Sequence, residues 1–214
     1  MKSVCAIAAV MLAFSLTGFA DTKVPCGQSL SRPLSARATL LIDSRPAGLE
    51  IVATDQETLR VSCTAGDDET AGDVVLHFSS TAHGGKLSIE GPSVHHRNNG
   101  IQVKIEVPRR TNLAIRMGAG QLTIEDVKGD KDLDLGAGQI TIKSIHAGDY
   151  RSVDASVSIG QVQASAFGVN SGGFFRSLSR KNPDGEYQLK AHVTTGQIEL
   201  LGNAEHDGES PKPD

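Results

Sequence analysis

The chain has 214 residues, of which 38% are hydrophobic and 21% are charged, and its formal net charge at pH 7 is -4. This composition excludes wholesale disorder and supplies enough apolar residues for one globular domain or one elongated stack. The mildly acidic balance without clustered Lys and Arg excludes a typical nucleic-acid-binding surface. The pair Arg109 and Arg110, after Pro108, is interpreted as solvated turn residues.

The first 20 residues have the features of a cleaved secretory signal. Lys2 precedes an apolar run over residues 4–16, and small residues end the segment before Asp21. A buried N-terminal strand or helix is the alternative. Because the apolar run is shorter than the about 20 residues of a membrane-spanning helix, no transmembrane anchor is expected after cleavage. We therefore expect a secreted or periplasmic protein.

Two cysteines remain once Cys5 is removed with the signal. In an oxidising compartment, Cys26 and Cys63 are predicted to form a structural disulfide, with two free thiols as the alternative. Closing a loop of this length in the unfolded chain would stabilise a weakly held N-terminal segment.

From about Ala38 onward, short segments with apolar residues two apart predict β-strands that bury one face. These segments are ATLLID (38–43), LEIVAT (49–54), LRVSC (59–63), VVLHF (74–78), KLSIE (86–90) and IQVKIEV (101–107). The dipeptide Asn99-Gly100 is typical of a hairpin turn. No segment shows the three-and-four spacing of a helix, so the fold class is all-β.

The second half of the chain repeats a unit of 18 residues. GAGQLTI (118–124) recurs as GAGQITI (136–142), and looser copies follow later in the chain. Such a unit provides two short strands and two tight corners, which is one rung of a parallel β-helix-like solenoid; rungs bury their apolar residues only by stacking. We predict Ile124 over Ile142 and Gln121 over Gln139. A β-sandwich of antiparallel hairpins is the alternative.

The repeated corner positions form the candidate site. At a corner, Gly provides a positive φ or a close backbone approach, and Gln provides a side-chain amide. The positions are Gly118, Gly120, Gln121, Gly136, Gly138, Gln139, Gly160, Gln161, Gly196 and Gln197. We expect the amides to stack into a ladder that stabilises the fold. A row that reads a ligand is the functional alternative.

The alternation, the Gly-x-Gly-Gln corners and the segment VPRRTNLAIRMGAGQLTIEDVKGDKDLDLGAGQITI (107–142) resemble the bacterial putative adhesin family of secreted or membrane-attached β-solenoid domains. The resemblance covers approximately residues 36–202. It implies a right-handed parallel β-helix-like fold at the bacterial cell envelope and transfers no catalytic residue. The expected organisation is a signal peptide (1–20), an N-terminal linker (21–35), a β-solenoid domain with less regular N-terminal strands (36–202) and a disordered tail (203–214).

The sequence contains no recognisable motif for catalysis or for metal binding. The Ser and His residues fit no nucleophile elbow or triad pattern, and the corners carry Gln and Ala where a calcium-binding repeat carries Asp. The acidic runs 67–69 and 130–134 and the pair His95 and His96 are interpreted as solvated loop residues. The alternatives are a hard-cation site at the acidic residues and a transition-metal site at the histidines. No catalytic residue, metal or cofactor is therefore expected.

The function expected from these features is a non-enzymatic scaffold or contact surface. A hydrolase or lyase that acts on polysaccharide along a solenoid face is the alternative. The chain has six Phe, two Tyr and no Trp. This scarcity of aromatic rings disfavours an extended platform on which sugars stack.

The stretch from Val169 to Tyr187 departs from the repeat. Phe174, Phe175 and Arg176 follow a Gly pair within it. They are interpreted either as a cap over the last apolar rung or as a contact with a partner, because aromatic residues and Arg are enriched at interfaces. The partner would be an envelope protein or surface of unknown identity.

Overall fold

The structure, a computed structural model, describes residues 21–45, 47–66, 73–91, 100–169 and 177–202. The predicted signal peptide and tail, residues 67–69, His95, His96 and the group Phe174, Phe175 and Arg176 lie outside these ranges. The strands are β1 (Asp21–Pro25), β2 (Leu30–Pro33), β3 (Thr39–Ser44), β4 (Ala47–Thr54), β5 (Thr58–Thr64), β6 (Val75–Thr81), β7 (Gly84–Glu90), β8 (Gln102–Pro108), β9 (Asn112–Glu125), β10 (Lys131–Ile145), β11 (Tyr150–Gln163), β12 (Ser177–Lys181) and β13 (Tyr187–Gly202). Two short 3₁₀ turns, η1 (Ala147–Asp149) and η2 (Ser165–Phe167), complete the described elements.

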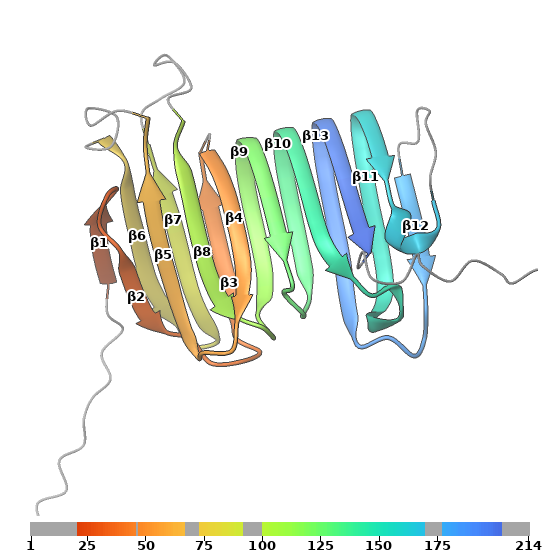
Figure 1. The fold of residues 1–214 in the computed structure, drawn as a ribbon, viewed down its shortest axis with the longest axis horizontal. Coiled ribbons are helices and arrows are strands. Elements are labelled where there is room, and N and C mark those ends of the chain that lie inside the picture. Colours follow the sequence, from red (N-terminus) through yellow and green to blue (C-terminus); the bar gives the residue numbers. More distant parts are fainter. Residues whose placement is uncertain (1–20, 46, 67–72, 92–99, 170–176, 203–214) are drawn as a thin grey trace, which may run out of the picture.

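All 13 strands belong to one mixed sheet, as the all-β prediction required (Figure 1). One path through the sheet runs β1-β6-β7-β3-β9-β10-β13-β11-β12, and a second path joins β2, β5, β8 and β4 to β9. The six segments predicted as strands from their alternation correspond to β3 to β8. Residues 21–35, expected as a linker, contain β1 and β2, which pair with β6 and β5.

The four long strands β9, β10, β13 and β11 are parallel and in register. Ile142 lies opposite Ile124, and Gln139 lies opposite Gln121, as predicted from the 18-residue repeat. The alternative of antiparallel hairpins through this region is therefore wrong. Among the described strands, antiparallel pairing is confined to the N-terminal ones, such as β6 with β7 and β5 with β8, and to the pair of β11 with β12.

The order of the long strands differs from that of a solenoid in which rungs stack in chain order. β13, the last strand in the sequence, lies between β10 and β11 and pairs in parallel with both. The stretch that interrupts the repeat thus contains β12, which pairs antiparallel with β11, before the chain returns through the middle of the stack. The sheet remains open, with β1 and β12 at the ends of its longer path.

Each long strand bends at its Gly-Gln corner, which is Gly-Ala-Gly-Gln in β9 and β10 only, so the sheet lies as two layers (Figure 1). In β9, Leu113, Ile115 and Met117 are buried before the corner, and Leu122 and Ile124 are buried after it. The spacing from Met117 to Leu122 is odd, so the buried side changes at the corner. β3 pairs with the first half of β9 and β4 with the second half, which places the apolar side chains of both halves in one core between the layers.

The disulfide between Cys26 and Cys63 is present, as predicted. It joins the turn after β1 to β5, and both cysteines belong to the buried core. Beside it, the backbone N–H of Gly27 donates to the carbonyl of Cys63 over 3.1 Å. The bond therefore fastens the N-terminal edge strands to the layer that contains β5.

We predict that Gly138→Ala destabilises the fold by about 3 kcal/mol or more. Gly138 has φ +134°, and a Cβ there would lie 1.8 Å from the carbonyl oxygen of Gly120. Gly118→Ala is the matched control because a Cβ at Gly118 meets nothing within 4 Å, and its effect should stay within about 0.5 kcal/mol. Urea denaturation measures both, and equal losses in the two variants would contradict the corner geometry.

Removal of the disulfide should lower the free energy of unfolding by about 4 kcal/mol, the chain-entropy value for a closed loop of this size, since the two cysteines are 37 residues apart. The change is the double variant Cys26→Ala with Cys63→Ala, measured against the oxidised protein by urea denaturation. Addition of a reductant should destabilise the unsubstituted protein and leave the double variant unchanged. A destabilisation of both would show that the reductant acts elsewhere.

Candidate functional site

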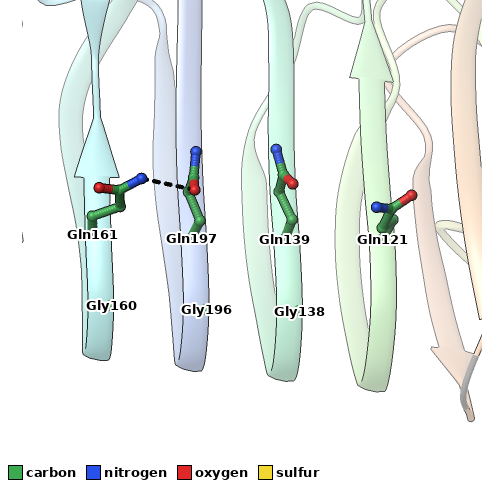
Figure 2. A pocket seen from close by; sticks show the side chains of 7 residues that line it. All are labelled: Gln121, Gly138, Gln139, Gly160, Gln161, Gly196 and Gln197. Atoms are coloured by element: carbon green, nitrogen blue, oxygen red, sulfur yellow. Dashed lines mark hydrogen bonds between the residues drawn. The ribbon is translucent and has the colours of Figure 1, made fainter.

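The four predicted glutamines form one row across the corners of the long strands. The pairing registers place them in the order Gln121, Gln139, Gln197 and Gln161, from β9 to β10, β13 and β11. Figure 2 shows the four side chains side by side on neighbouring strands. The row exists because the preceding glycines allow every strand to turn at the same height.

The corner glycines leave no room for a side chain. Gly120, Gly138, Gly196 and Gly160 have φ between +130° and +142°, which L side chains rarely adopt. A Cβ on each of them would lie between 1.7 and 2.0 Å from a carbonyl oxygen of the neighbouring strand. The sequence predicts glycine at a corner for two reasons, a positive φ and a close backbone approach. Both apply to each of these four residues. The earlier glycines differ, because a Cβ at Gly136 would meet the Gly118 carbonyl at 2.4 Å, whereas Gly118 has open space.

An open groove of about 620 Å³ follows this row. Its lining consists of the four glutamines together with Gly138, Gly160 and Gly196 (Figure 2). All seven are repeated corner positions identified from the sequence, and none of them is charged. The groove thus offers peptide groups and primary amides, which donate and accept hydrogen bonds but supply no nucleophile or general base.

The amide ladder is only partly formed. Gln161 Nε2 donates to Gln197 Oε1 over 2.8 Å, and Gln197 Nε2 donates in turn to Glu199. Gln139 Nε2 instead donates to the hydroxyl of Thr141 over 3.1 Å, and that hydroxyl donates to Glu199 over 3.3 Å. The side chain of Gln121 is exposed and has no hydrogen bond to another described residue. Of the four glutamines, Gln121 alone therefore has an amide without a hydrogen-bond partner among the described residues.

A fifth glutamine extends the row beyond the repeat. Gly48 of β4 pairs with Gln121, and Gln102 of β8 pairs with Gly48. The amide of Gln102 lies over Gly48, where a Cβ would come within 2.2 Å of its Oε1. Sequence reasoning missed Gln102 because it stands at the start of IQVKIEV, without a Gly-x-Gly corner before it. The only sequence signal was its place at the head of a predicted strand.

A buried lysine was also missed. Lys131 is 2% exposed and occupies the same column as Leu113, Leu189 and Val153 of the other long strands. Its Nζ donates to the hydroxyl of Tyr150 over 2.8 Å and to the carbonyl of Gly129 over 3.1 Å. Alignment of the two 18-residue copies would have revealed it, because Lys131 takes the position of Leu113.

Burial changes the protonation of this pair. It lowers the pKa of Lys131 to about 7, although the carboxylates of Asp130 and Asp149 oppose the shift. Burial also raises the pKa of Tyr150, as do Asp149 and the neighbouring Tyr187, whose ring centroid is 6.3 Å away. Two hydrogen bonds and the Tyr150 ring, 5.2 Å from Nζ, offset part of the cost of burying the ammonium group.

One hydroxyl and one imidazole meet on the outer face of the first halves of the long strands. Ser156 Oγ lies 3.0 Å from Nδ1 of His192, and Asp134 is the register partner of His192 on its other side. Within the described residues, no hydrogen bond joins Asp134 to His192. Strand β11 is paired on both sides at Ser156, with His192 and with Ser177, so the backbone N–H groups there are committed to the sheet.

The acidic run of residues 130–134 does not converge on one point. Asp130 accepts the backbone N–H of Gln188, and Asp132 pairs with Arg116 over 2.8 Å. Among the described residues, no three His, Cys, Asp or Glu side chains lie close enough together to hold a metal ion. The same part of the chain contains no helix of the length and hydrophobicity needed to cross a membrane.

Comparison with known proteins finds similarity at the level of structure. A putative cell adhesion protein from Clostridium sporogenes is similar over 82% of this chain and 99% of its own, with a TM-score of 0.54 and 13% sequence identity. A putative adhesin from Bacteroides fragilis aligns over 82% of this chain and 98% of its own, with a TM-score of 0.28 and 9% identity. No protein-family model and no curated protein matches the sequence. The likeness to the Clostridium protein concerns the fold alone.

The pair of Lys131 and Tyr150 predicts how stability depends on pH. The pKa of Lys131 is lower in the folded chain than in the unfolded chain, so the unfolded chain binds more protons between pH 7 and about 10. The free energy of unfolding should rise across this window by up to about 1.4 kcal/mol per pH unit. Above about pH 10 it should fall, because the raised pKa of Tyr150 makes the folded chain retain a proton that the unfolded chain loses.

Urea denaturation at intervals of one pH unit from 7 to 11 measures this profile. The matched variant is Lys131→Met, an apolar side chain of similar length in a column that is otherwise apolar. It should show no rise between pH 7 and 10. An identical rise in the variant would assign the pH dependence to other groups.

Proposed function

We propose that the protein is a non-enzymatic, adhesin-like protein of the bacterial cell envelope or its exterior, whose stacked strands act as a solenoid-like scaffold for a contact surface. The observation that carries this proposal is the uncharged groove of about 620 Å³ along the glutamine row. Four equivalent strands present the same polar group at the same height, which suits contact with an extended partner better than turnover of a small substrate.

The predicted location rests on separate features. The features of residues 1–20 are typical of a secretory signal, and the disulfide between Cys26 and Cys63 suits an oxidising compartment. The similar structure from Clostridium sporogenes, a putative cell adhesion protein, supports an extracellular or envelope role.

The alternative is a hydrolase or lyase that acts on polysaccharide. Hydrolysis of a glycosidic bond uses a pair of carboxyl groups, and no carboxyl group lines the glutamine groove. The contact between Ser156 and His192 instead resembles part of a serine hydrolase, which cleaves esters and amides. A serine hydrolase also requires donors that stabilise an oxyanion and a group that orients the imidazole. The pairing of β11 on both sides uses the N–H groups that would serve as donors. The two side chains lie on the outer face of a paired sheet, and neither lines the glutamine groove. These features favour the non-enzymatic proposal.

The test measures adhesion and turnover separately. Beads coated with the protein should bind to isolated envelopes of the producing bacterium, and the variant with Gln121→Ala and Gln139→Ala should bind about fivefold less. Gln188→Ala, an exposed glutamine at the other end of β13, is the matched control and should bind as the unsubstituted protein does. Adhesion that is unaffected by the groove variant would refute the groove as the contact surface.

The turnover arm uses p-nitrophenyl acetate and the release of reducing ends from soluble polysaccharides. No activity above background is expected, and Ser156→Ala should change nothing. Activity that is lost in Ser156→Ala would favour the hydrolase instead.

A further inference from the structure

The surroundings of the glutamine groove are nearly free of charge. The row before the corner glycines consists of Ala119, Ala137, Thr195 and Ile159. The next outward-facing row beyond the glutamines consists of Thr123, Thr141, Glu199 and Gln163. Glu199 is the single charged member of these two rows, and it accepts hydrogen bonds from Gln197 and Thr141. The four long strands therefore present no cation in these two rows to attract a phosphate, sulfate or carboxylate, which favours an uncharged ligand. On β4 and β8 the second row continues with Glu50 and Lys104, which are register partners of opposite charge.

The glutamines are spaced by the sheet itself. Neighbouring strands lie about 4.8 Å apart, so the row from Gln121 to Gln161 is roughly 14 Å long. In an extended peptide, each residue advances about 3.3 Å and equivalent side chains recur at about twice that distance, which matches neither one nor two strand spacings. In an extended β-1,4-linked sugar chain, one pyranose ring advances by nearly one strand spacing. Successive rings face opposite ways, so equivalent hydroxyl groups recur at every second ring, close to two strand spacings.

The chemistry of the row agrees with this match. A primary amide carries donors and an acceptor side by side, as sugar hydroxyl groups require. Gln121 has its amide free of other described residues, and Gln102 continues the row over Gly48. A second copy of the chain is a poorer occupant, because stable interfaces bury about 800 Å² on each partner and the groove spans only the corners of four strands.

We propose that the glutamine groove binds a neutral, unbranched β-1,4-linked glycan in an extended conformation, with about one sugar ring for each glutamine. This inference rests on the proposed function and names its ligand class. The groove has no aromatic lining, so recognition proceeds through hydroxyl groups rather than through stacking on rings. Each contact is then weak, and useful adhesion depends on many copies that engage one polymer.

The experiment titrates ¹⁵N-labelled protein with cello- and chito-oligosaccharides of two to six rings and follows the side-chain NH₂ signals of glutamine by NMR. The signals of Gln121 and Gln139 should shift, and that of Gln188 should not. Affinity should increase with chain length up to four or five rings and then remain constant, because the row contains four glutamines and the extension at Gln102. Gln121→Ala should weaken binding of the hexamers about fivefold, and Gln188→Ala should have no effect.

Maltohexaose, whose α-1,4 linkage coils the chain, is the matched control ligand and should bind at least tenfold more weakly. Three outcomes would each overturn the ligand class. They are equal binding of maltohexaose, binding of a neutral extended peptide without binding of the β-linked hexamers, and no NMR shift with millimolar β-linked hexamers. If the hexamers fail while bead adhesion still depends on Gln121 and Gln139, the contact surface stands and the glycan does not. If adhesion is also independent of these glutamines, both proposals fail.

Discussion

The architecture depends on how closely the backbone of one corner approaches the next. At Gly138, Gly196 and Gly160, the space that a Cβ would occupy lies within 1.8 Å of a carbonyl oxygen on the preceding strand of the stack. This approach allows four strands to turn at one height and keeps their hydrogen-bond registers equal on both sides of the bend. The shared register then puts leucine, isoleucine and valine into columns within the core. It also puts the glutamines into a row on the surface.

The 18-residue repeat correctly predicted the strands, their corners and the pairing of β9 with β10, because the alternation of apolar residues determines all three. The pairing of Ile124 with Ile142 followed from two nearly identical 18-residue copies. The place of β13 did not follow, because Val193 and Val157 satisfy the same column equally well and their spacing in the sequence says nothing about which one contacts Leu135. In a stack of interchangeable strands, the order is decided by non-local contacts that periodicity does not encode.

The candidate site was predictable to a similar extent. The corner glycines and their glutamines stand out in the sequence, and together they line the groove. Gln102 and Lys131 did not stand out, because each belongs to the site or core only through its neighbours across the sheet. Gln102 needs Gly48 beneath it, and Lys131 needs the hydroxyl of Tyr150, which lies 19 residues later in the chain. A polar residue in an apolar column is visible from sequence only after the columns are aligned.

The insertion of β13 between β10 and β11 has a consequence for how the chain reaches this fold during synthesis. A regular solenoid can add each new rung to the one before it as the ribosome delivers the chain. Here β11 is made before the strand that separates it from β10, so the C-terminal part of the stack cannot form from its N-terminal side alone. Both β10 and β11 pair with β13, a strand of 16 residues that is made after them. This half of the stack is therefore complete only after β13 has been made, and in a secreted chain only after β13 has crossed the membrane.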